Sequence, residues 1–326
     1  MKAIIVESFG SPENMKVVDV EMPTIHTDQI LIRVKTTSVN FADIKSRYGK
    51  KGKGKLPYIP GLEASGVIEK IGDKVKSFAV GQRVLAFPHH GSYAEYIVAD
   101  ENLTFAIPDS VDFDTAGACG IVSFLSYKLL ADVARLQSGE TVLIHSAAGG
   151  VGTTAIQIAK ALGAAKIIGT VGDESKIPMA ISAGADEVIC YEKGDFAEKV
   201  NALTDGKGAD VILDCIAGDI TEKSLHCLAH YGRLVMFGNS SGKTGQIHTN
   251  DLHASCRSVL GFSLGTTRKE HPERLQHTAI QVFRLLEHGK LNIKISERFA
   301  LQDASLAHQW VESRKSTGKV LLVVEH

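Results

Sequence analysis

The feature that most constrains this chain is a short apolar run that leads into a glycine-rich turn and then into a helical pattern. Residues 141–146 read TVLIHS, and residues 147–152 continue as AAGGVG. Glycine at 149 lets the backbone approach a pyrophosphate, and glycine at 152 lets the helix pack closely on the strand. Backbone N–H groups at the helix start attract phosphate. The pattern predicts a dinucleotide site, although an alanine stands where the first glycine is usual. Its predicted cofactor-binding residues are Ala148, Gly149, Gly150 and Val151.

The end of the next predicted strand indicates which dinucleotide is bound. An NAD enzyme places a carboxylate there to hold the ribose hydroxyls, whereas this chain has Val171 followed by Gly172. Asp173 comes slightly late, and we interpret it as the N-cap of the following helix. Gly172 leaves room for a 2′-phosphate, and Lys176 supplies a positive charge one helical turn later. The sequence therefore favours NADPH over NADH, with an ordinary solvated position as the alternative for Lys176.

The rhythm of apolar runs changes along the chain. Up to about residue 110, short apolar runs alternate with turn signals, which predicts mostly β-structure. After about residue 120, strand-like runs alternate with helical stretches, as in parallel strands joined by crossover helices. Residues 273–289 and 304–313 predict amphipathic helices, and KVLLVV near the C-terminus predicts a closing strand. An α/β unit inserted within a β-rich domain accounts for this order.

Size and charge limit the classes of partner. A chain of 326 residues, 44% of them hydrophobic, can supply two domains with cores. Lys and Arg number 36 against 37 Asp and Glu, so nucleic acid and anionic membranes are not expected partners. We find no stretch approaching the ~20 apolar residues that span a bilayer, and therefore expect a cytoplasmic protein. The biased segment GKKGKGK at 49–55 predicts a solvated loop, with phosphate steering as the alternative.

Five segments together resemble the quinone oxidoreductase branch of the medium-chain dehydrogenase/reductase superfamily. They are NFAD at 40–43, PGLEASG at 60–66, VGQRV at 80–84, HSAAGGVG at 145–152 and FGNSSG at 237–242. The resemblance covers almost the whole chain. It implies an α/β fold in which a Rossmann doubly wound parallel sheet is inserted in a β-rich GroES-like catalytic domain. The expected boundaries are 1–121 and 264–326 for the catalytic domain and 122–263 for the NADPH-binding domain.

The resemblance also implies roles for individual residues. It places Gly172, Lys176 and Tyr191 around the adenosine 2′-phosphate, and it places Asn40, Phe237, Gly238, Asn239 and Ser240 along the nicotinamide half of NADPH. Asn40 and Arg47 are the candidate catalytic residues. Asn40 orients the nicotinamide and the acceptor, while Arg47 either faces the acceptor or pairs with a carboxylate. Family members form homodimers by strand pairing, for which the apolar run at 258–262 suits either an edge or an interior strand.

Metal ligands of the zinc-dependent relatives are replaced in this chain. Those enzymes have a cysteine in place of Asn40 and a histidine in place of Leu62, and one thiol, Cys119, cannot hold a catalytic zinc. We therefore expect no metal and a zinc-independent reduction of a quinone or conjugated carbonyl between the two domains. Solvent would supply the proton, with Asp43 anchoring its own turn and Glu63 a buried hydrogen-bond partner.

Two other functions remain open on the sequence. Leu125 stands where the family often has a threonine, so the acceptor pocket differs. An NADPH-dependent reductase of α,β-unsaturated ketones or aldehydes is the closest alternative. A low-turnover NADPH-binding protein is the alternative from another class.

Overall fold

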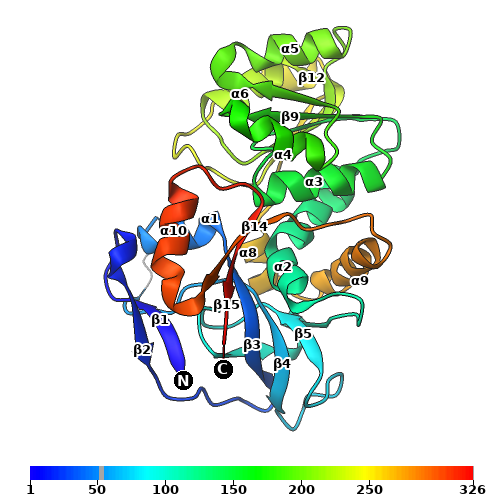
Figure 1. Ribbon diagram of the computed structural model, residues 1–326. Helices are drawn as coiled ribbons and strands as arrows, with labels where there is room; N and C mark the ends of the chain where they lie inside the picture. The colour runs from blue at the N-terminus through cyan, green and yellow to red at the C-terminus, as the bar shows by residue number, and fades with distance from the viewer. Residues whose placement is uncertain (51–54, 326) are drawn as a thin grey trace. The chain divides into compact units, whose positions relative to one another are not determined.

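The computed structural model describes residues 1–50 and 55–325, which form two compact units. Unit 1 contains Met1–Val122, Thr267–Glu287 and Ile295–His326, and unit 2 contains Ser123–Thr266 and His288–Lys294. Both ends of the chain therefore belong to unit 1 (Figure 1). Residues 51–54 of the predicted solvated loop lie outside the described residues.

Unit 2 is built on a six-stranded sheet in the order β10-β9-β8-β11-β12-β13, with every neighbouring pair parallel. The chain starts in the middle at β8, winds outward to β10, and then returns to β11 and winds the other way. This is the strand order of a Rossmann sheet and confirms the predicted doubly wound fold. The strands are β8 Thr141–Ile144, β9 Lys166–Val171, β10 Glu187–Cys190, β11 Ala209–Asp214, β12 Leu228–Met236 and β13 Ser258–Gly261.

Helices cover the sheet of unit 2 in two groups (Figure 1). Helix α3 packs on β8, β9 and α4, while α5 and α6 pack on each other and on β10, β11 and β12. The central strand β11 is buried along its whole length, as expected for a parallel strand with helices on both faces. The helices are α3 Gly150–Ala161, α4 Ile177–Ser182, α5 Phe196–Leu203, α6 Asp219–His226 and α7 Asn250–His253.

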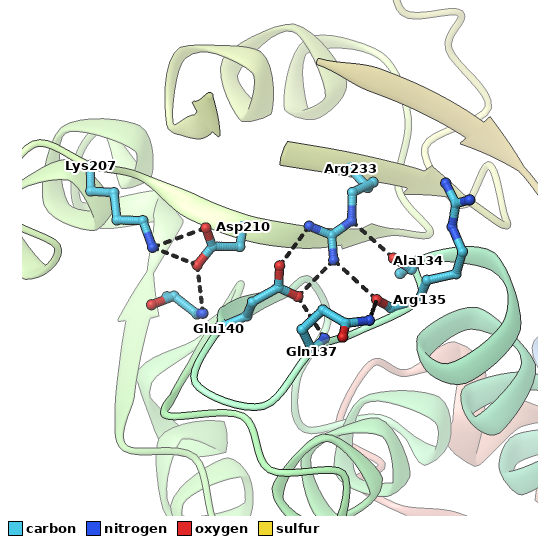
Figure 2. A network of polar contacts seen from close by, with 8 residues as sticks. Ala134, Arg135, Gln137, Glu140, Lys207, Asp210 and Arg233 are labelled. Carbon is cyan, nitrogen blue, oxygen red and sulfur yellow. Dashed lines mark hydrogen bonds and ion pairs between the residues drawn. The ribbon is translucent and has the colours of Figure 1, made fainter. Parts of the chain in front are cut away.

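A partly buried ion pair links the amino ends of the central strands. Arg233 of β12 donates to both carboxylate oxygens of Glu140, at 2.8 and 2.6 Å, and to the carbonyl of Ala134 at 2.9 Å (Figure 2). Beside it, Asp210 of β11 accepts from the backbone N–H of Thr141 at 2.8 Å. This network lies at the end of the sheet opposite the carboxyl ends of the strands, so it has a structural role.

Unit 1 is built on a seven-stranded sheet in the order β14-β15-β3-β4-β5-β7, with β6 also paired to β3, and β1 and β2 form a separate hairpin. Strands β15, β3, β4 and β5 run side by side in Figure 1. The strands are β1 Lys2–Val6, β2 Met15–Asp19, β3 Gln29–Val39, β4 Ala64–Ile71, β5 Arg83–Ala86, β6 Tyr96–Asp100, β7 Thr104–Ala106, β14 Ile295–Ala300 and β15 Lys319–Val323. Its helices are α1 Phe41–Arg47, α9 Arg274–Glu287 and α10 Ala304–Glu312. The predicted C-terminal helices and closing strand are confirmed.

Two further helices each contain a point at which the chain passes from one unit to the other. They are α2 Phe113–Tyr127, which continues as a π-helix to Val133, and α8 Leu264–Glu270. The segment Phe113–Val133 is long and apolar enough to span a membrane, so the expectation that no stretch approaches this length was wrong. In the structure, 67% of its most apolar part is buried inside the protein, and a buried core helix can have the same length and composition as a membrane span.

Candidate active site

The glycine-rich turn joins β8 to α3. Its backbone is held by hydrogen bonds from Ala147 N–H to the Thr170 carbonyl at 2.9 Å and from Gly149 N–H to the Ser146 carbonyl at 3.0 Å. Ser146 adopts a positive φ of 55°, an uncommon conformation for a residue with a side chain. A Cβ atom at position 152 would lie 2.3 Å from the Ser146 carbonyl oxygen, so only glycine allows this approach. The turn therefore presents the start of α3, whose first N–H groups lack helical acceptors.

The residues predicted to surround a 2′-phosphate come together after β9 and β10. A Cβ atom at Gly172 would lie 2.7 Å from the Tyr191 hydroxyl, so the two residues are direct neighbours. Lys176 ends the short 3₁₀ turn that follows, and the Asp173 carboxylate caps this turn by accepting from Ser175 N–H at 2.8 Å. Hydrogen bonding to the Ser175 side chain, and then to its backbone N–H, lowers the pKa of Asp173, and the bond to the N–H confirms the predicted capping role. The carboxylate is thus engaged locally at the end of β9.

The loops after β11 and β12 are bound to each other. Phe237 N–H donates to the Asp214 carbonyl at 3.0 Å, and Ser240 N–H donates to the Cys215 carbonyl at 2.9 Å. The Asn239 side-chain oxygen accepts from Gly242 N–H at 2.7 Å, which closes the turn that contains the exposed residues 238–240. The Asp214 carboxylate stiffens the neighbouring loop by accepting from the N–H groups of Ile216 and Ala217 and from the Thr221 hydroxyl.

All these loops follow parallel strands, so they meet at the carboxyl edge of the sheet in unit 2, where α/β sheets bind ligands. The predicted residues at 148–151, 172, 176, 191 and 237–240 all lie on this edge, and the groups present suit a dinucleotide with an additional phosphate. Sequence reasoning did not identify Ser146 and Ala217, the two residues here with side chains and positive φ. Strained residues of this kind cluster at functional sites, but their φ values leave no sequence signal.

Asn40, the predicted catalytic residue of unit 1, belongs to a buried polar cluster that comprises Ser38, Asn40, Glu63 and Lys319. The Glu63 Oε1 atom accepts from Ser38 Oγ at 2.5 Å, from Asn40 Nδ2 at 3.0 Å and from Lys319 Nζ at 3.1 Å. Lys319 Nζ also donates to Asn40 Oδ1 at 2.7 Å. The predicted role of Glu63 as a buried hydrogen-bond partner is confirmed. Asp43, as predicted, anchors its turn by accepting from Asn40 N–H at 2.8 Å.

Arg47 is fully buried and pairs with the carboxylate of Glu312, while Nη1 donates to the carbonyl of Gly10 at 2.7 Å. Of the two alternatives that the sequence left open, the structure therefore contains the carboxylate pair. A guanidinium with no exposed surface joins α1 to α10 and the N-terminal segment, which is a structural position.

The positions of the missing zinc ligands hold groups that do not coordinate a cation well. Asn40 shares its amide oxygen with the ammonium group of Lys319, and Leu62 has an aliphatic side chain. Cys119 is completely buried, and burial and then the Glu63 charge raise the pKa of its thiol. Among the described residues, no three His, Cys, Asp or Glu side chains group as metal ligands would.

Comparisons with known proteins agree with this arrangement. Residues 26–109 match the family model "Alcohol dehydrogenase GroES-like domain", and residues 150–281 match the model "Zinc-binding dehydrogenase". The chain is 36% identical to a quinone oxidoreductase of Pseudomonas aeruginosa, over 99% of each chain. It is 34% identical to the human quinone oxidoreductase, over 99% of this chain and 98% of the relative.

A solved structure gives the same result. Escherichia coli quinone oxidoreductase complexed with NADPH matches with a TM-score of 0.92 and 32% sequence identity, over 99% of this chain and 100% of that one. The match extends through both units.

Proposed function

The chain belongs to the quinone oxidoreductases of the medium-chain dehydrogenase/reductase superfamily, and from that premise we propose that it reduces quinones with NADPH and without zinc. It is an oxidoreductase, and its relatives are quinone oxidoreductases over their whole length. The observation that carries the choice of cofactor is the end of β9, where Gly172 lies against the Tyr191 hydroxyl and Lys176 follows one turn later.

These residues suit a phosphate and not a bare ribose. A ribose-specific site needs a carboxylate at the strand end. Here the Asp173 carboxylate accepts a hydrogen bond from the Ser175 N–H instead. A hydroxyl from Tyr191 and an ammonium from Lys176 are both donors to phosphate oxygens. The backbone of residues 148–151 would hold the pyrophosphate at the start of α3, and the loop 237–240 would hold the nicotinamide half.

Bound NADPH supplies the hydride, so the chain itself has to position the reactants. Asn40 has two amide hydrogens, and Glu63 accepts one of them. We propose that the other orients the carbonyl oxygen of the acceptor. Solvent delivers the proton, because the reduced oxygen of a quinone is readily protonated by water. Placement of the acceptor between the two domains belongs to the same proposal.

Zinc independence is supported by the donor chemistry around Asn40. A catalytic zinc needs three protein ligands, commonly thiolate, imidazole or carboxylate. Here the cationic Lys319 already lies within hydrogen-bond distance of both Asn40 and Glu63, so a divalent cation beside them would meet an existing positive charge. Reduction of an electron-poor acceptor does not require the alkoxide stabilisation that zinc gives to alcohol oxidation.

The proposed assembly is a cytoplasmic homodimer. Strand β13 lies at the edge of its sheet, which leaves one side of its backbone available for pairing with a second copy. Light scattering of the purified protein across a concentration series tests this, and a monomer at every concentration would contradict it.

The test of function is NADPH and NADH oxidation by chelator-treated protein, with 9,10-phenanthrenequinone and an enone presented in parallel. We expect the quinone to support NADPH oxidation at a rate that chelation does not change. Adding zinc back should not increase this rate. Turnover of the enone alone would identify a double-bond reductase. Cofactor binding without turnover of either acceptor would identify a binding protein.

A further inference from the structure

Lys319 is a charged residue that the proposed reaction does not otherwise use. It begins β15, its side chain is 4% exposed, and its two acceptors lie 256 and 279 positions away in the sequence. Removing an ammonium and a carboxylate from water costs several kcal/mol per ion, and replacing such a pair by apolar residues often stabilises a protein. Stability alone therefore does not account for an ion pair buried beside a predicted catalytic residue.

The cluster fixes the orientation of the Asn40 amide. Nδ2 donates to the Glu63 carboxylate and Oδ1 accepts from the Lys319 ammonium, at 3.0 and 2.7 Å. If the amide turned over, its oxygen would face a carboxylate and its nitrogen would face an ammonium, so both contacts would become repulsive. An asparagine held by glutamate alone would lack the second constraint. Lys319 thus decides in which direction the remaining amide hydrogen points.

Glu63 is itself held in place from several sides. Its Oε2 atom accepts from Ile121 N–H at 2.6 Å, and a Cβ atom at Gly120 would lie only 2.6 Å from the same oxygen. Oε1 accepts the three bonds from Ser38, Asn40 and Lys319. The carboxylate therefore has little freedom to move, and it serves as a fixed base for both Asn40 and Lys319.

We infer that Lys319 is a positioning residue for the reduction: its ammonium group, anchored on Glu63, locks the Asn40 amide so that one N–H is presented to the carbonyl oxygen of the acceptor. This inference rests on the proposed role of Asn40. A misaligned donor slows the reaction without abolishing cofactor binding, because the phosphates are held by residues of unit 2. A misplacement of about 1 Å can cost roughly 100-fold in rate.

A double-mutant cycle tests the inference. Lys319→Met, Asn40→Ala and the double variant are compared with the wild type in kcat and KM for the quinone at saturating NADPH, in NADPH affinity and in Tm. We expect each single variant to lower kcat by roughly 100-fold, and the double variant to fall no further than Asn40→Ala, because Lys319 acts through Asn40. The NADPH Kd should stay within about threefold in Lys319→Met, which an unfolded or collapsed protein would not permit.

Arg233→Met is the control, since it removes a partly buried cation from its carboxylate, Glu140, at the edge of the sheet in unit 2 that lies opposite the carboxyl ends of the strands (Figure 2). It should lower Tm and leave kcat within about twofold of the wild type. If Lys319→Met does not fold, Lys319→Gln, which keeps a polar side chain beside Glu63, goes through the same cycle with Asn40→Ala.

The outcomes separate the two proposals. Wild-type kcat in Asn40→Ala would overturn the proposed role of Asn40 and, with it, the inference. A reduced kcat in Asn40→Ala together with unchanged kcat in Lys319→Met would overturn the inference alone. Multiplicative losses in the double variant would also overturn it, because Lys319 would then act independently of Asn40.

Discussion

Lys176 is the residue on which cofactor choice depends. It lies one turn after Gly172, and Gly172 in turn lies against the Tyr191 hydroxyl. A lysine that pairs with a 2′-phosphate contributes only to binding of the phosphorylated cofactor, since NADH has a hydroxyl at that position. A phosphate ligand and a solvated surface lysine look identical in the sequence. Removing the side chain distinguishes them, because only a phosphate ligand would affect NADPH and not NADH.

We predict that Lys176→Ala raises the KM for NADPH by roughly 10- to 150-fold, the equivalent of ~1.5–3 kcal/mol for a charged hydrogen bond. The KM for NADH should change by less than about threefold. Lys160→Ala, which removes an exposed lysine at the far end of α3, is the control. Steady-state kinetics with both cofactors make the measurement, and an equal effect on NADPH and NADH would exclude the phosphate role.

Single residues also show where sequence reasoning reached its limit. Asp173, Asp43 and Glu63 were assigned correctly because their roles follow from local motifs or from burial within a motif. Lys319 was missed because its partners, Asn40 just after β3 and Glu63 just before β4, lie more than 250 positions away, and a lysine at the start of a strand looks like an ordinary solvated residue. Arg47 could not be assigned for the same reason, because Glu312 is 265 positions away.

Helix α3 shows how an element depends on one missing side chain. Its first turn packs against the end of β8 so closely that the Cβ of any residue at position 152 would meet the Ser146 carbonyl at 2.3 Å. The backbone there is already held by hydrogen bonds to Thr170 and Ser146, so it cannot retreat without losing them. The glycine pattern predicted this packing correctly, because a strand, a tight turn and a helix leave few alternative geometries.

Gly152→Ala should destabilise unit 2 by about 1–3 kcal/mol, the usual cost of overpacking, and should weaken NADPH binding because the start of α3 is displaced. Chemical denaturation and NADPH titration measure the two effects. Gly261→Ala is the control for adding a methyl group, as the described residues leave nothing within 4 Å of a Cβ there and its φ is ordinary. If Gly152→Ala kept both wild-type stability and wild-type affinity, the close approach would not be a requirement of the fold.

At the scale of elements, the alternation of strands and helices in unit 2 was predictable, as were the C-terminal helices and the closing strand. The strand order follows because parallel strands joined by helices wind right-handed from a central strand. Two features were not predictable. The apolar segment Phe113–Val133 changes from α-helix to π-helix after Tyr127, and β13 was equally compatible with an edge or an interior position until its sole described neighbour, β12, was known.

Considered as a whole, the molecule contains a completely buried histidine in each unit. In unit 2, His145 Nδ1 lies 2.8 Å from Thr170 Oγ1 and Nε2 lies 2.9 Å from Ser224 Oγ. In unit 1, His308 Nε2 lies 3.1 Å from the Tyr93 hydroxyl. Burial lowers the pKa of His145 to about 4 and that of His308 to about 3, with the Arg47 charge as a further cause for His308.

These two pKa values make the stability of both units depend on pH in the same direction. An unfolded chain protonates histidine below about pH 6.5, whereas the native protein keeps both rings neutral until the pH approaches their lowered values. The unfolded state therefore binds more protons between about pH 6.5 and 4, and the native state loses stability as the pH falls. Each histidine contributes a slope of about 1.4 kcal/mol per pH unit within this window.

We therefore expect the free energy of unfolding to be highest above about pH 6.5 and to fall steadily toward pH 4. His145→Gln retains hydrogen-bonding groups for Thr170 and Ser224 but cannot titrate, so its stability should depend on pH less steeply than that of the wild type, by about one proton. Urea denaturation at a series of pH values gives both slopes, and His253→Gln controls for the loss of an exposed histidine. A slope in His145→Gln equal to the wild-type slope would mean that His145 is already protonated in the native protein. In that case the buried network of unit 2 would carry a positive charge beside Asp214, and its hydrogen bonds to Thr170 and Ser224 would both have to be donated by the ring.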